Sequence, residues 1–206
     1  MKINLLTASL AVSVLSGCVG GVAHLQATSR TAPVTGGVVD ETLSNEQNGT
    51  ISAVGVGTVA YVTGVDSDRG QMVASVGISG TPTVGAARTT GSGTYTTSYS
   101  YGVIDNITRT STTISGVRGG ESGTLTLTAD FDRGTLNGSN SELDVSAGIS
   151  GNTLSGIATA YYSYTGASGN VTGTLDGQIG ATGVIASFHG HDADTVMAGG
   201  LVGTSP

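Results

Sequence analysis

The residues best suited to metal chemistry stand together near the C-terminus, in the run HGHDAD, which holds His189, His191, Asp192 and Asp194. In an extended chain the two histidines share one face, because side chains alternate along a strand. Two imidazoles and two carboxylates could begin the metal centre of an enzyme. A metal site needs three or four ligands in fixed geometry, and the run also fits the last hairpin turn of the protein. We favour the turn and expect no metal or other cofactor.

Tyrosines supply a second candidate, a ligand-binding surface. Tyr95, Tyr99 and Tyr101 share one face of a predicted strand, and Tyr162 and Tyr164 share one face of another. Tyr offers rigid, amphipathic area that can stack a sugar or hold a protein. The same side chains can line a barrel wall, since the chain has few other large residues to fill a core. We favour the wall, and any exposed tyrosine is the first candidate for a binding patch.

The rest of the composition argues against catalysis and against nucleic acid. The formal charge is −7, and Lys2, the single lysine, lies at the N-terminus. Nucleic acids and anionic lipid surfaces select clusters of Lys and Arg, so we expect no nucleic-acid partner. No Gly-x-Ser-x-Gly elbow and no free Cys/His pair is present, and general acid–base groups are scarce. We expect a protein that is not an enzyme.

The only cysteine, Cys18, follows a short apolar segment, residues 3–15. This segment is shorter than the roughly 20 residues that cross a bilayer as a helix, and Lys2 precedes it, as in an export signal. The tetrapeptide Leu15-Ser16-Gly17-Cys18 resembles the lipobox of bacterial lipoproteins at every position. An ordinary signal peptide with a chance cysteine is the alternative.

The lipobox resemblance implies an anchor. Residues 1–17 would be the signal peptide, and Cys18 would be acylated, with palmitate as one expected chain, and become the mature N-terminus. Two or more acyl chains hold a protein stably on a membrane, whereas one holds it marginally. Val19 stands where an Asp would favour the inner membrane. We therefore expect the outer membrane as a partner, through acylated Cys18, with the protein on the cell surface.

The folded part is predicted to be all-β. In TLTLTADF (residues 124–131) apolar residues fall on one face and Thr and Asp on the other, as in a half-buried antiparallel strand. DRG then predicts a turn, and TLNGS the return strand. Similar runs recur along the chain at 51–62, 71–79, 93–102, 142–150, 152–164, 170–180 and 183–190. This rhythm predicts a small antiparallel up-and-down β-barrel with a filled, water-excluding interior and no helix.

The domain organisation follows from the same pattern. We expect a lipidated cysteine and a flexible, disordered tether over residues 18–48, because Gly, Pro and polar residues dominate there. Residues 49–88 are predicted to form a short β-rich region, and residues 89–206 the barrel.

Four phrases in the last half of the chain carry a family resemblance: Asp130-Phe131, Leu136-Asn137-Gly138, Gly151-Asn152 with Gly156, and Phe188-His189-Gly190 with Ala193. In this order they resemble the C-terminal barrel of transferrin-binding-protein-B-like surface lipoproteins. The sequence departs from the family at His189 and His191, where an aromatic residue and a proline are usual. The resemblance implies capture of a solute or a host protein, and the barrel domain alone is matched.

These observations together predict a surface lipoprotein that binds an extracellular protein or a small nutrient without catalysis, through one end of the barrel. Two alternatives stay open. The first is a structural envelope lipoprotein with no specific ligand. The second is a metal-dependent enzyme that uses the turn of His189 and His191.

Overall fold

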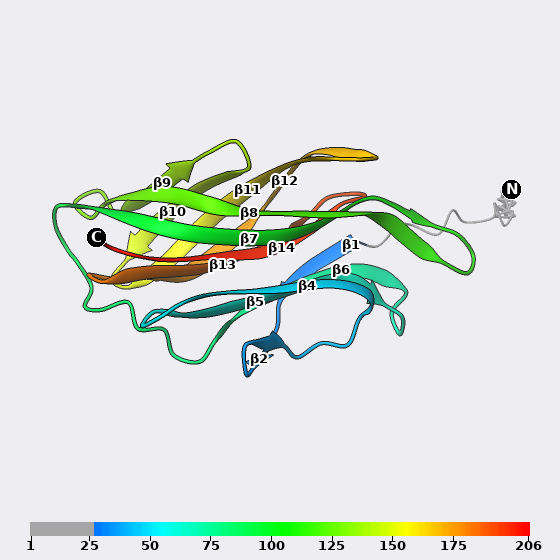
Figure 1. Cartoon of the computed structure of the whole chain (residues 1–206), viewed down its shortest axis with the longest axis horizontal. Helices are drawn as coiled ribbons and strands as arrows, with labels where there is room; N and C mark the ends of the chain where they lie inside the picture. The colour runs from blue at the N-terminus through cyan, green and yellow to red at the C-terminus, as the bar shows by residue number, and fades with distance from the viewer. Residues whose placement is uncertain (1–26) are drawn as a thin grey trace, which may run out of the picture.

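The computed structural model describes residues 27–206, and every regular element in this range is a β-strand (Figure 1). The predicted signal peptide and Cys18 lie outside the described residues. A four-stranded sheet has the order β1-β6-β5-β4, with bounds β1 (Ala27–Thr31), β4 (Ser44–Ala53), β5 (Gly57–Asp66) and β6 (Gln71–Ser79). A two-stranded hairpin, β2 (Val34–Thr35) and β3 (Val38–Val39), lies against this sheet. No helix long and apolar enough to cross a membrane occurs between residues 27 and 206.

The remaining strands close into a barrel in the order β10-β11-β12-β13-β14-β7-β8-β9. The first four in sequence are β7 (Ser92–Arg109), β8 (Ile114–Asp130), β9 (Thr135–Ser139) and β10 (Leu143–Ser150). The last four are β11 (Thr153–Tyr164), β12 (Ala167–Ile179), β13 (Gly183–His191) and β14 (Val196–Thr204). Sequence neighbours pair antiparallel, and β14 closes the ring on β7. The predicted all-β class and up-and-down barrel are confirmed.

Alternation along β8 shows why these residues form the wall. Leu125 and Leu127 point inward and are buried, whereas Thr126 and Thr128 are exposed. Leu, Val, Ala and Phe from the other strands meet them, so the interior is filled by side chains, with Phe188 fully buried among them. The turn after β8 is built locally, since the Asp130 carboxylate accepts the Arg133 backbone N–H at 3.0 Å and Gly134 takes a φ of 66°. TLNGS then returns as β9, as the sequence predicts.

One stretch that was predicted to be a single strand forms parts of two strands. Residues 51–62 were expected to be continuous, but β4 ends at Ala53 and β5 starts at Gly57. Gly55 has a φ of 77° and Gly57 a φ of 152°, which side-chain-bearing residues rarely adopt. The two glycines turn the chain back, so what looked like one long run is a hairpin.

The predicted tether is wrong for residues 27–48. This stretch contains β1, the β2–β3 hairpin and the first half of β4. β1 lies parallel to β6, with Ala27 opposite Met72, and such pairing of distant residues leaves no trace in local composition. The run SNEQNG is polar because β4 is an edge strand and its first residues are exposed to water.

The four-stranded sheet packs on the outside of the barrel, over β13, β14 and β7. Val59, Met72 and Val76 of the sheet join Val202 and Ile104 of the barrel in one buried cluster. The Tyr61 hydroxyl lies 2.8 Å from the hydroxyl of Ser100 in β7. Figure 1 shows the result: the sheet lies on one side of the barrel, and β9 to β12 lie on the other.

Candidate functional site

Four of the five predicted tyrosines meet inside one end of the barrel. The Tyr99 and Tyr101 rings lie 6.2 Å apart from centroid to centroid, and those of Tyr162 and Tyr164 lie 5.4 Å apart. Tyr95 lies away from them, and its hydroxyl donates to the Gly180 carbonyl at 2.8 Å. The period-two pattern therefore grouped these side chains correctly on their strands, and the closure of the barrel brings the two groups together.

Burial decides what these tyrosines do. Tyr162 exposes 7% of its surface, and Tyr95, Tyr99 and Tyr101 expose 2% or less. Tyr164 is half-buried against the same cluster. Their burial gives no support to one exposed ligand-binding patch of five tyrosines, so a role for them in binding stays a prediction. The interpretation in which they line the wall is the one that their burial supports.

Tyr101 spans the interior from β7 to the opposite strands. Its hydroxyl lies 2.7 Å from the carbonyl of Tyr161 and 3.1 Å from that of Glu142, and it can donate to either. Burial raises the pKa of Tyr101, and the carboxylate of Glu121 raises it further. Burial also raises the pKa of Tyr99. These phenols therefore stay neutral near pH 7 and act as hydrogen-bond donors that hold this end of the barrel together.

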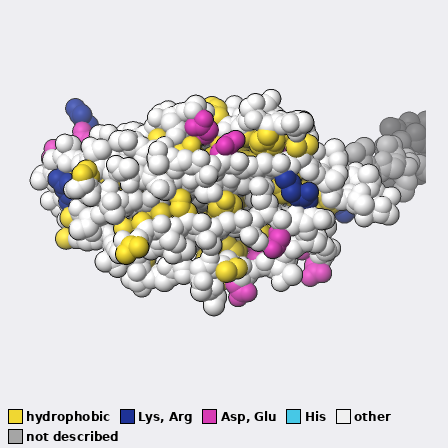
Figure 2. Space-filling view, viewed as in Figure 1, with side chains coloured by type: hydrophobic (Ala, Val, Ile, Leu, Met, Phe, Trp, Pro, Cys, Tyr) yellow, Lys and Arg dark blue, Asp and Glu magenta, His cyan; other side chains and the backbone are white. Residues whose placement is uncertain are grey.

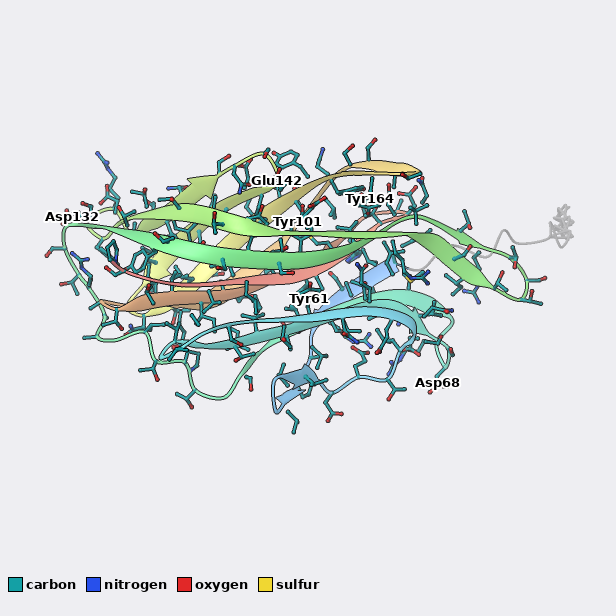
Figure 3. The ribbon with its side chains drawn as sticks, viewed as in Figure 1. Tyr61, Asp68, Tyr101, Asp132, Glu142 and Tyr164 are labelled. Atoms are coloured by element: carbon teal, nitrogen blue, oxygen red, sulfur yellow. The ribbon has the colours of Figure 1, made fainter. Side chains whose placement is uncertain are left out.

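A side opening lies directly above these rings. β9 and β10 are short. The flanking strands β8 and β11 extend past the turn that joins β9 to β10, so the barrel wall has a gap beyond this turn. The gap forms a pocket of about 250 Å³ lined by Glu121, Ser141, Glu142, Tyr161, Tyr162 and Ser163, which we call the side opening. Asn140 fixes the turn, since its side-chain oxygen accepts the backbone N–H of Leu143 at 2.8 Å. Figure 3 shows Glu142 near Tyr101, across the molecule from Asp68 in the turn between β5 and β6.

The side opening is acidic. Glu121 and Glu142 both line it, and within residues 27–206 neither carboxylate forms a salt bridge. The Tyr99 hydroxyl lies 3.3 Å from a Glu142 carboxylate oxygen. An anionic ligand would meet two like charges here, so the opening suits neutral or positively charged groups.

A second hollow, the outer groove, adjoins the side opening on the outside of β8 to β11. Its volume is about 530 Å³, and short polar side chains from four strands line it together with Ile157. Ile157 exposes 51% of its surface and Tyr161 exposes 37%. The Tyr161 hydroxyl donates to the Asp144 carboxylate at 2.9 Å, and Asp144 lines the groove. Tyr161 therefore lines the side opening and contacts a residue of the outer groove.

Sequence reasoning missed Tyr161 and Ile157, although a signal was present. Tyr161 stands between the two inward-facing residues Ala160 and Tyr162, so strict alternation places it outside. Ile157 lies on the same outward face, four residues earlier. An apolar residue on a face otherwise made of Thr, Ser and Asp is the feature to look for.

In the HGHDAD run, the two histidines contact β1 and Asp192 shapes a turn. His189 and His191 lie at the end of β13, and the Nδ1 atom of each is 3.0 Å from the hydroxyl of Ser29 in β1. Asp192 shapes the turn, since its carboxylate accepts the backbone N–H of Thr195 at 2.9 Å. Burial lowers the pKa of His189. Across the described residues, no group of three or more His, Cys, Asp or Glu side chains is placed to hold a metal ion.

Comparisons with known proteins add a likeness of fold. No protein-family model and no curated protein matches the chain. Among solved structures, isotype 1 transferrin binding protein B of serogroup B Neisseria meningitidis matches at 16% identity and a TM-score of 0.46, over 77% of this chain and 35% of its own. Intact transferrin binding protein B of Actinobacillus, with N and C lobes, matches at 14% identity and a TM-score of 0.48, over 78% and 38%. The Haemophilus parasuis vaccine antigen of the same name matches at 12% identity and a TM-score of 0.46, over 78% and 37%.

The chain is similar to transferrin binding protein B. The four sequence phrases resemble the same protein. The likeness concerns fold alone, and this chain spans little more than a third of the length of each structure it matches.

Proposed function

We propose that this protein is an acylated outer-membrane lipoprotein, exposed on the cell surface, that binds an extracellular ligand without catalysis. The binding region is the β8–β11 face, by which we mean the side opening and the outer groove joined at Tyr161. Residues 1–17 are the signal peptide in this proposal, and Cys18 carries the lipid.

One observation carries the proposal of binding. Only four large hydrophobic side chains are exposed in residues 27–206, and two of them, Ile157 and Tyr161, lie on one strand beside two adjoining hollows. Exposed apolar side chains that gather at a concave, polar-rimmed surface are typical of ligand sites. The other two lie on the four-stranded sheet side, where Val38 lines a single hollow of about 290 Å³ and Val54 lies in the turn between β4 and β5.

The arrangement of the two layers suits an anchored capture protein. The N-terminal segment joins the described fold at β1, in the four-stranded sheet. The β8–β11 face lies on the side of the barrel away from that sheet (Figure 1). A lipid attached at Cys18 would therefore leave this face open to the medium.

A structural envelope lipoprotein is the second candidate, and the hydroxyl-rich outer wall of the barrel favours it. On the outside of the barrel Thr94 lies opposite Thr128, Thr96 opposite Thr126, and Ser98 opposite Thr124. Most of the surface in Figure 2 is likewise neither hydrophobic nor charged. Where no exposed apolar side chain interrupts it, such a hydroxyl surface offers no apolar anchor for a partner, and this candidate predicts no selective binding.

Lipid attachment is tested by metabolic labelling with a clickable palmitate analogue. Wild-type protein should incorporate the label and the Cys18→Ser variant should not, with both present at equal amounts by immunoblot. Protease added to intact cells should degrade the wild-type protein. Equal labelling of the two proteins would refute acylation at Cys18, and protection of the wild type in intact cells would refute surface exposure.

Binding is tested with the full chain purified in detergent and immobilised. Culture fluid and serum are passed over the wild type, over Ile157→Ser/Tyr161→Ala, and over Val38→Ser/Val54→Ser, which removes the two exposed hydrophobic residues of the other layer. The proposal expects a component that the wild type and the Val38/Val54 variant retain and the Ile157/Tyr161 variant loses. Identical elution from all three would favour the structural candidate.

A further inference from the structure

We infer that the ligand of the outer groove is a neutral saccharide. This inference rests on the proposed function and names its ligand class. It depends on the outward side chains of β8 to β11, on the charges that line the groove, and on the ring of Tyr161.

Strand register arranges the floor of the groove in two rows. The first row crosses four strands with Thr128, Asn137, Ser146 and Ile157. The second row contains Ser139, Asp144 and Thr159. Neighbouring strands lie about 4.8 Å apart, so a row over four strands extends about 14 Å. The groove therefore offers a wide, shallow field of short polar groups.

The chemistry of these groups fits sugar hydroxyls. Ser and Thr hydroxyls both donate and accept, the Asn137 amide does the same from two atoms, and the Asp144 carboxylate accepts only. Each hydroxyl of a polyol can both donate and accept a hydrogen bond, so it can pair with any of these groups. One Asp144 oxygen already accepts from Tyr161, which fixes the carboxylate in place.

The charges of the groove exclude an acidic ligand. No Lys or Arg lines the groove, and Asp144 is its only charged residue. A phosphate, a sulfate or an acidic sugar would meet this carboxylate without a cation to balance it. A small cation would find one carboxylate where a stable site needs several ligands. With one carboxylate, already paired with Tyr161, among many uncharged polar groups, the groove suits a neutral molecule best.

Tyr161 and Ile157 supply the apolar part of the site. A pyranose ring has a face of C–H groups and a rim of hydroxyls, so it needs a flat apolar surface bordered by hydrogen-bonding groups. The Tyr161 ring is exposed, is held by Asp144, and lies on the same face of β11 as Ile157. Protein interfaces concentrate several buried aromatic and Arg anchors, whereas the groove lining has no aromatic ring and no Arg, and Tyr161 is the one exposed aromatic residue beside it in residues 27–206.

The test measures binding of defined sugars to the full chain in a phosphocholine detergent, because detergents with sugar headgroups would compete. The probes are neutral tetrasaccharides of glucose, galactose, mannose and N-acetylglucosamine, with a sialylated and a sulfated tetrasaccharide beside them. The readout is the δ1-methyl NMR signal of Ile157 during titration. The proposal expects saturable shifts with at least one neutral sugar and none with the acidic ones.

Variants separate the site from general effects. Tyr161→Ala should weaken the neutral sugar about tenfold, because the stacking surface is lost. Tyr161→Phe keeps the ring and should retain most of the affinity, and Val54→Ser, at an exposed residue on the other layer, should change nothing. Equal binding by Tyr161→Ala, or stronger binding of the acidic sugars, would overturn the inference.

The outcome also distinguishes this inference from the proposed function. If no neutral sugar binds while the wild type still retains a component that Ile157→Ser/Tyr161→Ala loses, the saccharide inference is overturned and the proposed function stands. If neither sugar nor any such component is bound, both are overturned.

Discussion

Replacing Tyr101 by phenylalanine should lower the free energy of unfolding by about 1–3 kcal/mol. The buried hydroxyl lies within hydrogen-bonding distance of two backbone carbonyls on the far side of the barrel, at 2.7 and 3.1 Å. The hydroxyl has one proton and donates to one of the two carbonyls at a time, so its removal leaves an acceptor in the barrel interior without this donor, which costs about 1–3 kcal/mol. Phenylalanine keeps the ring and its packing, and therefore isolates the hydroxyl.

The assay is urea unfolding of the full chain in detergent, followed by far-ultraviolet circular dichroism. A loss of about 2 kcal/mol corresponds to a fall of about 4–8 °C in Tm for a chain of this size. Tyr161→Phe is the matched control, since the hydroxyl of Tyr161 is solvent-accessible and water can replace it. A Tyr101→Phe variant as stable as the wild type would refute the crossing contact, and so would an equal loss from Tyr161→Phe.

Two further predictions concern the packing of the layers and the effect of pH. A Cβ at Gly200 would lie 2.4 Å from a methyl of Val59, so Gly200→Ala should lower the free energy of unfolding by about 1–3 kcal/mol, measured by thermal unfolding. The control is Gly148→Ala, whose Cβ would meet nothing closer than 3.7 Å and which should be nearly neutral. Equal Tm values for the two variants would contradict the tight contact. Burial lowers the pKa of His189 below its ordinary value of 6.5. As the pH falls, His189 therefore binds a proton in the unfolded chain before it does so in the folded protein, and the free energy of unfolding should decrease from pH 7.5 to 5.5. His189→Asn should flatten this part of the stability profile measured in urea, and an unchanged slope would show that another group titrates there.

Local pattern predicted most of the barrel and part of the site. Alternation in TLTLTADF assigned Leu125 and Leu127 to the inside, and the Asp130 turn followed from residues within four positions of one another. The same alternation placed Tyr99 and Tyr101 on one face. It could equally have placed Tyr161 outside, because the strand neighbours of an inward residue must point outward.

Other features depend on contacts between residues far apart in the sequence. The tether prediction failed over residues 27–48 because β1 gains its partner from β6, more than forty positions later, and because an edge strand such as β4 keeps a polar face. The side opening arises only because β9 and β10 stop short of β8 and β11, a comparison of lengths across the closed barrel. Asp144 meets Tyr161 through the pairing of β10 with β11.

The sequence by itself determined most of the barrel strands, their inward faces and the turn after β8, because side-chain alternation and glycine or aspartate turn chemistry act over a few residues. It also carries the lipobox that predicts the anchor at Cys18. The tertiary structure alone decided that the tyrosines are buried, that β14 closes the ring on β7, and that Tyr161 and Ile157 are left exposed beside a groove. These outcomes follow from pairings between distant strands, whose register no local pattern records.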